Sequence, residues 1–255
     1  MKYKIVRWIL ELATRLMKIY KPNMAPIKVP ERFILAHQPP VGAILQALIK
    51  AYQKVFKEAS YWVEDWSQET VQQKLEMEVG RKTSFLVTMA GNEKMPVVGF
   101  AWGEILNPYQ LENRISKSLG KSPTDFNQLT NQLLRRNVNR FVYADEFAIV
   151  AGFRNGIEPI RGLLQPWLEW AWLERQVISC LFWTTPASPI YKLGLYMGFE
   201  PIFRTQVEEK DIVFIFNKDF RPLLKICQNL DTRRGIRLII VVEKILGHKK
   251  KRGKE

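Results

Sequence analysis

The sequence has few cysteines and few histidines, and this scarcity excludes several kinds of site. Its 255 residues include two cysteines, Cys180 and Cys227, and two histidines, His37 and His248. Two cysteines cannot form a disulfide framework or a cysteine-rich zinc site, and two distant histidines offer little for metal ligation or histidine catalysis. We therefore expect no metal site and a reducing compartment.

Long apolar runs are lacking as well. No stretch approaches the roughly 20 apolar residues that a membrane-spanning helix needs. Glu11 interrupts the N-terminal apolar run before the core of a signal peptide could form. We expect a cytoplasmic protein on these grounds, with peripheral attachment to a membrane as the alternative.

Apolar, aromatic and positively charged residues are plentiful. Hydrophobic residues make up 47% of the chain, with eight tryptophans and fourteen phenylalanines, which predicts a well-filled core. Lys and Arg number 39 against 25 Asp and Glu, giving a net charge of +14. The positive electrostatic field of such a protein attracts phosphates, anionic membranes, nucleic acid or an acidic cofactor, and the net charge alone does not show which of these it binds.

The two ends of the chain differ from its middle. Residues 2–20 have the spacing of a basic amphipathic helix, which either docks on the main domain or binds a membrane surface or a partner, and prolines mark a linker up to residue 30. Residues 220–255 form a basic extension whose apolar stripe suits a helix or a strand. The terminal KKKRGKE is either a solvated tail or a lipid or nucleic-acid patch, and nucleic acid is disfavoured because no aromatic residue interrupts it.

Residues 31–219 read as one domain. Two helices precede a β-hairpin with an expected turn at Gly91–Asn92, and a polar insertion over 107–139 follows. The remaining order is a strand at 141–150, a helix from about 157, a strand at 177–185, a second helix from 188 and two final strands. This order predicts an α/β (α+β) fold, with a central mixed sheet flanked by helices and helical extensions at both ends.

Three segments resemble the GNAT superfamily of acyl-coenzyme A dependent N-acyltransferases, over about residues 35 to 219. They are AYQKVFKEASYWVEDWSQETVQQKL, FLVTMAGNEKMPVVGFAWGEI and DEFAIVAGFRNG, and the Gly198–Phe199 step lies where the family turns from its fourth helix into the next strand. The resemblance implies that the protein transfers an acyl group, with acetyl as the first expectation, from acyl-CoA to an amine. The amine would belong to a small molecule, a peptide or a protein.

The resemblance also implies where the acyl-CoA binds. Its pantetheine arm would follow the strand backbone at Phe147, Ala148 and Ile149. Its phosphates would bind the next turn and the start of the following helix, where free N–H groups attract anions. The residues concerned are Arg154, Asn155, Gly156, Ile157, Glu158 and Arg161. Only Arg154 matches the family pattern outright, and Pro159 removes one donor.

The expected catalytic residues depart from the family in one place. A tyrosine four residues before the Gly-Phe step commonly protonates the departing thiolate, and here that position is Gly194. Tyr191 and Tyr196 are candidate substitutes for this acid, or they pack in the core. Gly194 would alternatively make room for a longer acyl chain or a bulky substrate.

Glu146 matches the family's frequent glutamate and is the expected base, with a salt bridge as its alternative role. Strand alternation predicts that its neighbour Asp145 faces the opposite side of the sheet. Two other functions stay open: a GNAT-like CoA-binding or regulatory domain without catalysis, and a transferase of longer acyl chains at a membrane surface.

Overall fold

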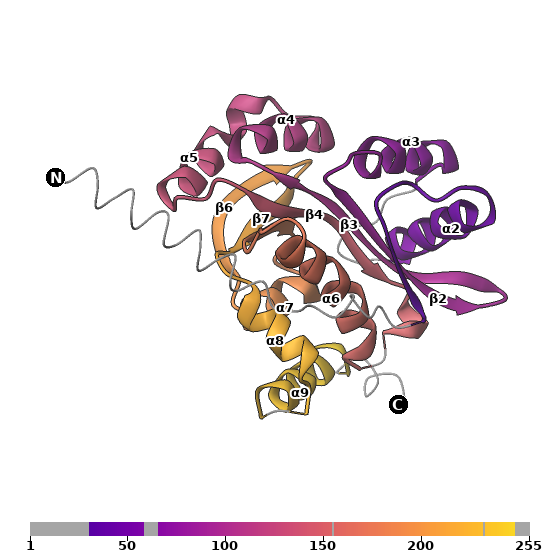
Figure 1. Cartoon of the computed structure of the whole chain (residues 1–255). Coiled ribbons are helices and arrows are strands. Elements are labelled where there is room, and N and C mark those ends of the chain that lie inside the picture. Colours follow the sequence, from indigo (N-terminus) through magenta and orange to yellow (C-terminus); the bar gives the residue numbers. More distant parts are fainter. Residues whose placement is uncertain (1–30, 59–65, 155, 232, 248–255) are drawn as a thin grey trace.

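The computed structural model describes residues 31–58, 66–154, 156–231 and 233–247 (Figure 1). The predicted N-terminal helix and linker, the end of the basic tail and Asn155 lie outside the described residues.

One mixed sheet of seven strands forms the centre of the fold, in the order β1-β2-β3-β4-β5-β7-β6. Its strands are β1 (Phe33–Ala36), β2 (Ser84–Asn92), β3 (Met95–Leu106), β4 (Phe141–Ile149), β5 (Cys180–Thr184), β6 (Glu200–Val207) and β7 (Lys210–Asn217). Among these pairs β4 with β5 is parallel and the others are antiparallel. The predicted fold class is confirmed, whereas the hairpin turn lies at Glu93–Lys94, because β2 continues through Gly91–Asn92.

Helices cover both faces of this sheet (Figure 1). One face packs against α2 (Gly42–Glu58), α3 (Gln68–Val79), α4 (Pro108–Leu119) and α5 (Asn127–Arg135). The other packs against α6 (Glu158–Leu173), α7 (Pro189–Tyr196), α8 (Arg221–Gln228) and α9 (Arg233–Gly247). Short 3-10 turns lie at Pro123–Phe126 and Ala151–Phe153.

Local capping explains where several helices begin. The Ser67 hydroxyl accepts a hydrogen bond from the Thr70 N–H at the start of α3, and Ser188 does the same for Ile190 at the start of α7. At α4, Asn107 and Gln110 form a reciprocal capping box. The predicted polar insertion is therefore a pair of helices, α4 and α5, whose apolar sides pack on the sheet.

The segment after residue 219 also packs on the main core. Phe220, Leu223 and Leu224 belong to the same apolar cluster as α6, and so do Leu238 and Val242 of α9. The β-branched run that suited a helix or a strand is helical. The expected C-terminal extension is thus, over residues 221–247, a pair of helices that helps to close one face of the domain.

A β-bulge interrupts the pairing of β3 with β4. Gly103 pairs with Ala144 and Trp102 with Glu146, so Asp145 has no counterpart on β3. A Cβ atom at position 103 would overlap the carbonyl oxygen of Tyr143 and lie 2.9 Å from the Cα of Ala144. A glycine is therefore needed opposite the bulge.

Gly103→Ala is expected to destabilise the fold by about 1–3 kcal/mol, because the added methyl group meets backbone that cannot move aside cheaply. Urea unfolding followed by circular dichroism measures the change. Gly152→Ala is the matched control, since a Cβ there has no heavy atom within 4 Å. Equal stability of the two variants would contradict the steric role of Gly103.

Candidate active site

The sheet opens between β4 and β5. The described strands pair only through Val142 with Cys180 and Tyr143 with Leu181, although β4 continues to Ile149 and β5 to Thr184. A cavity of about 270 Å³ lies at this opening and is lined by residues of both strands. The edge of β4 that faces β5 therefore borders the cavity instead of a neighbouring strand.

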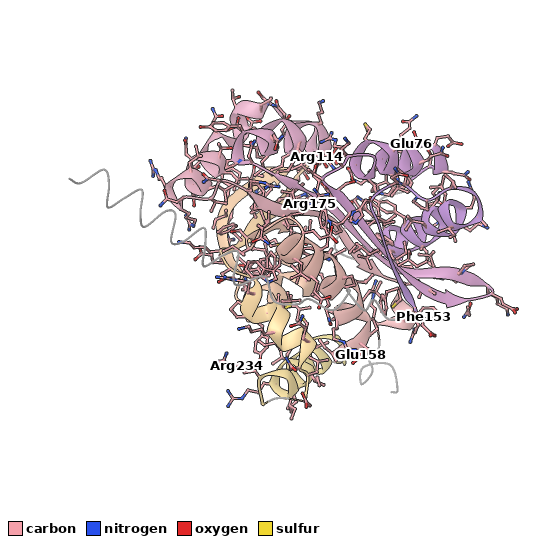
Figure 2. The ribbon with its side chains drawn as sticks, in the orientation of Figure 1. Glu76, Arg114, Phe153, Glu158, Arg175 and Arg234 are labelled. Carbon is pink, nitrogen blue, oxygen red and sulfur yellow. The ribbon has the colours of Figure 1, made fainter. Side chains whose placement is uncertain are left out.

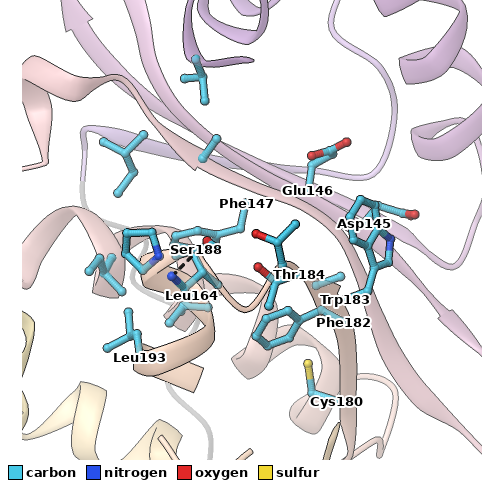
Figure 3. A pocket seen from close by; sticks show the side chains of 18 of the residues that line it. Asp145, Glu146, Phe147, Leu164, Cys180, Phe182, Trp183, Thr184, Ser188 and Leu193 are labelled. Atoms are coloured by element: carbon cyan, nitrogen blue, oxygen red, sulfur yellow. Dashed lines mark hydrogen bonds between the residues drawn. The ribbon is translucent and has the colours of Figure 1, made fainter. Parts of the chain in front are cut away.

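The cavity reaches both faces of the sheet. On one side its lining includes Tyr52, Trp66, Lys74 and Ser118, and on the other Leu164, Trp167, Ile190 and Leu193. Figure 3 shows Asp145 and Glu146 together at one end of the lining, with Leu164 and Leu193 at the other. The first side is polar and charged, and the second is mostly apolar.

Asp145 and Glu146 point to the same face of the sheet. Glu146 contacts Tyr52 of α2 and Lys74 of α3, and Asp145 contacts Arg114 of α4. The expectation of opposite faces was wrong because the bulge at Asp145 inserts one residue into the strand and so cancels one step of the alternation. The bulge thus brings two carboxylates to one wall of the cavity.

The expected base, Glu146, is buried and held by two partners. The Tyr52 hydroxyl donates to its Oε1 over 3.0 Å, and Lys74 Nζ lies 3.3 Å from the same oxygen. Burial raises the pKa of Glu146 above its ordinary value, and the positive charge of Lys74 limits that rise. A carboxyl with a raised pKa is a better proton acceptor at neutral pH than an ordinary one, provided that it is ionised.

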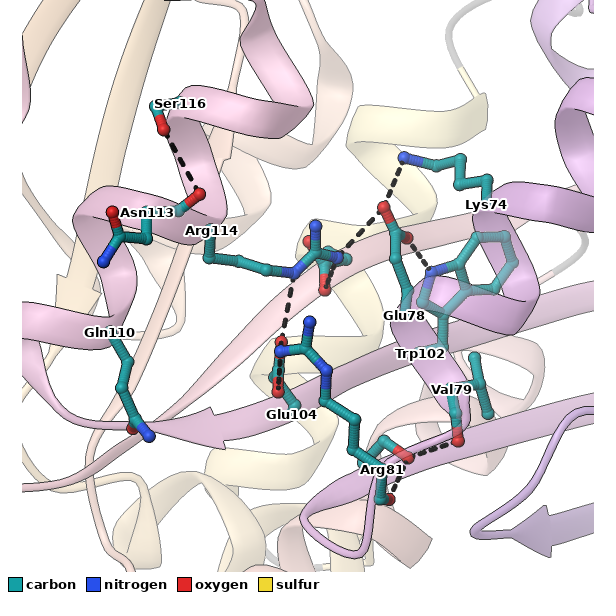
Figure 4. Close-up of polar contacts among 12 residues, drawn as sticks. Lys74, Glu78, Val79, Arg81, Trp102, Glu104, Gln110, Asn113, Arg114 and Ser116 are labelled. Carbon is teal, nitrogen blue, oxygen red and sulfur yellow. Dashed lines mark hydrogen bonds and ion pairs between the residues drawn. The ribbon is translucent and has the colours of Figure 1, made fainter. Parts of the chain in front are cut away.

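Lys74 also connects Glu146 to a buried carboxylate, Glu78. Lys74 Nζ lies 3.0 Å from Glu78 Oε1, and Trp102 Nε1 donates to Glu78 Oε2 over 2.7 Å (Figure 4). Burial alone would lower the pKa of Lys74, but the charges of Glu146 and Glu78 outweigh it and raise that pKa above its ordinary value. Lys74 is therefore a fixed cation in this wall.

Arg114 extends the network from α4. Its Nη2 lies 2.9 Å from both Glu78 Oε1 and Asp145 Oδ2, and its Nε donates to Glu104 Oε1 over 3.0 Å. Arg81 also binds Glu104. Four carboxylates face three cations here, so one negative charge remains when all seven groups are ionised. Burial and the negative charge of Glu78 raise the pKa of Asp145 well above its ordinary value, although the positive charge of Arg114 acts to lower it.

Helix α7 explains the glycine at position 194. The Phe199 N–H donates to the Gly194 carbonyl over 3.0 Å and the Gly198 N–H to the Leu195 carbonyl over 3.2 Å, which is a Schellman ending with Gly198 at φ +87°. A Cβ at Gly194 would lie 2.5 Å from Ile215 Cδ1 and 3.2 Å from Phe182. Close packing on the sheet therefore favours glycine, and the space expected there for a longer acyl chain is filled.

Neither candidate acid from α7 lines the cavity. The helix contributes Pro189, Ile190 and Leu193 to the lining, whereas Tyr191 packs against the core cluster and Tyr196 is 45% exposed. The structure thus does not bring Tyr191 or Tyr196 together with Glu146, and their acid role stays a prediction.

Some of the predicted acyl-CoA-binding residues line the cavity, and others do not. Phe147, Ala148, Ile149 and Arg154 line the cavity. The Arg154 Nε donates to the Ile149 carbonyl over 2.6 Å, which holds the guanidinium at the end of β4. Gly156, Ile157, Glu158 and Arg161 lie beside the cavity at the start of α6, where Arg161 pairs with Glu158. None of the described residues caps this helix start with its side chain.

Three buried polar atoms among the lining residues have neither a hydrogen-bond partner nor an ion pair in the described structure. They are Trp66 Nε1, Trp167 Nε1 and Thr185 Oγ1. Buried polar groups are rarely left without a partner, so these atoms fit a ligand that has its own donors and acceptors, such as the amides of a pantetheine arm.

Sequence reasoning missed Tyr52, Lys74 and Arg114. Lys74 and Glu78 are four residues apart on a predicted helix, and this spacing by itself is typical of an ion pair on the helix surface. The capping box at Asn107 and the apolar spacing that follows it could have revealed α4, but no local signal shows that Arg114 reaches β4.

Known proteins resemble this chain in structure and not in sequence. No family model matches the chain, and no curated protein matches it by sequence. A polyamine N-acetyltransferase from Drosophila melanogaster aligns with a TM-score of 0.52 and 7% identity, over 73% of this chain and 99% of its own. A mosquito arylalkylamine N-acetyltransferase-like protein aligns with a TM-score of 0.52 and 12% identity, over 72% and 99%.

The chain has the fold of the GNAT acetyltransferases. An acetyltransferase of the GNAT family from Bacillus anthracis also aligns, with a TM-score of 0.45 and 10% identity, over 74% of this chain and 95% of its own. At these identities the likeness concerns the GNAT fold and leaves activity and substrate open.

Lys74→Met is expected to raise the pKa of Glu146 further, because the variant keeps the burial but loses the neighbouring positive charge. A pH titration of the Glu146 side-chain carboxyl carbon by NMR measures this. In the wild type the midpoint should lie above the ordinary value of about 4.3, and in the variant higher still.

Lys74→Arg is the matched control, since it keeps the charge at the same place. A Glu146 midpoint that is unchanged in Lys74→Met, in a protein with native circular dichroism, would show that Lys74 does not set the protonation of this carboxyl.

Proposed function

We propose that this protein is an N-acyltransferase that moves an acyl group, acetyl in the simplest case, from acyl-CoA directly to an amine. The supporting observation is the cavity in the opened sheet. It has a carboxylate, Glu146, on one face and an arginine, Arg154, near the start of α6 on the other. A path through the sheet between these two groups would let an amine and a thioester meet from opposite faces.

Acyl-CoA would supply the activated acyl group, as a thioester. Phe147, Ala148 and Ile149 would border its pantetheine arm, Thr185 and Trp167 would offer hydrogen bonds, and Arg154 with the start of α6 would bind its phosphates. Arg161 would add positive charge at that turn, although Glu158 already pairs with it.

Glu146 would remove the proton from the incoming amine. An alkylammonium with a pKa of about 10.4 is almost wholly protonated at neutral pH and cannot attack a carbonyl. Its proton would pass to the Glu146 carboxylate, and the neutral nitrogen would then form the new bond to the acyl carbon as the C–S bond breaks. The second proton, which the nitrogen loses on becoming an amide, would go to the departing thiolate and give free CoA thiol. Tyr52 and Lys74 hold the carboxylate for this step.

Direct transfer fits the cavity better than a covalent acyl-enzyme. Cys180 lines the cavity and is its one cysteine among the described residues, but burial raises the pKa of its thiol well above the ordinary value. A thiol kept protonated is a poor nucleophile, and His37, the one histidine among the described residues, does not line the cavity to activate it.

Wild-type protein given acetyl-CoA and a panel of primary amines is expected to release free thiol. Glu146→Gln should lower turnover about 10²–10⁴-fold at neutral pH, because the amide cannot accept the proton. The loss should shrink at high pH, where more of the amine is already neutral. Thiol release measured from pH 6 to 10 tests this.

Glu200→Gln is the matched control, since that carboxylate lies on β6 with a side chain 59% exposed. Full activity of Glu146→Gln at neutral pH would eliminate the base assignment, and acyl-CoA binding without turnover would favour the non-catalytic reading. The same assay on Tyr191→Phe and Tyr196→Phe tests their predicted acid role.

Arg154→Ala is expected to raise the Kd for CoA about tenfold or more, through loss of a charged contact to the phosphates. Isothermal titration calorimetry measures the affinity. Arg204→Ala removes one positive charge from an exposed site on β6 and should leave it unchanged. Unchanged affinity in Arg154→Ala, with the fold intact, would mean that the phosphates bind elsewhere.

A further inference from the structure

Helix α9 exposes a face that combines apolar and basic side chains. Ile236 and Ile240 are 48% and 56% exposed, Arg237 is exposed beside Ile240, and Arg234 is exposed at the flank of this face. Residues four apart lie side by side on a helix, so the two isoleucines form a continuous apolar spot. Figure 1 shows α9 at the periphery of the molecule beyond α8, and Figure 2 labels Arg234 at this end.

The orientation of this face is fixed by packing on the opposite side of α9. Leu238 and Val242 are buried in the main core cluster. Gly235 lies so close to the backbone of Leu230 that a Cβ atom there would overlap it. The helix therefore cannot turn Ile236 and Ile240 inward without losing these contacts.

Charge limits what can cover this face. Residues 233–254 include nine Lys and Arg residues and one acidic residue, Glu243. The N-terminal segment 2–20 has five basic residues against one acidic residue, and a second copy of the chain would present the same arginines. Both would be repelled, so the partner must be negatively charged and must also accept apolar side chains.

We propose that this face of α9 binds the surface of a bilayer that contains anionic lipids. Ile236 and Ile240 would enter the boundary between headgroups and acyl chains, while Arg237 and the flanking Arg234 attract the acidic headgroups. This mode needs no spanning segment, and none of the helices in the described residues is long and apolar enough to be one.

Co-sedimentation of the full-length protein with vesicles tests the proposal. Binding is expected to vesicles of phosphatidylcholine with phosphatidylserine and not to phosphatidylcholine alone, and to weaken as salt rises. The double variant Ile236→Ser with Ile240→Ser should lower the partition coefficient about tenfold or more, because it removes the apolar part of the contact and keeps every charge.

Val41→Ser with Ile44→Ser is the matched control, because these residues are 82% and 48% exposed at the start of α2. It should bind vesicles as the wild type does. Three results would overturn the proposal: no vesicle binding by the wild type, equal binding by the α9 variant, or binding to a DNA duplex in place of vesicles.

Discussion

The separation of β4 from β5 is the constraint on which the rest of the site depends. Two parallel residue pairs hold the strands together at one end, and the backbone then diverges while each strand stays paired on its other side. Backbone groups on the open edges lose strand partners, and such groups are costly when left buried and unpaired. The opening thus creates both a cavity and a demand for a hydrogen-bonding ligand.

The charged wall of the cavity is stable because each of its members is paired. A buried carboxylate without a partner would become protonated or destabilise the fold. Here α3 supplies Lys74 and α4 supplies Arg114, so the carboxylates on β3 and β4 meet cations from both neighbouring helices. The network also fastens α3 and α4 to the same stretch of sheet, which links the shape of the cavity to its electrostatics.

Sequence patterns predicted the parts of this molecule that depend on local spacing. The order of most helices and strands follows from apolar periodicity, although β1 and α4 were not predicted, and Glu146 and Arg154 were proposed from the resemblance to the GNAT superfamily. The bulge was not predictable, because it depends on Gly103, which lies about 40 residues away and pairs across the sheet. Lys74 and Arg114 were missed for the same reason, since only tertiary packing brings them to β4.

The close packing around Gly194 limits which residues could replace it during evolution. A side chain at that position would enter the volume held by the end of Ile215 and the ring of Phe182, so a residue as large as tyrosine would fit there only if those side chains moved or became smaller. Both also pack in the core, where shrinking them first would leave a void. A tyrosine at position 194 is therefore hard to reach by one substitution at a time.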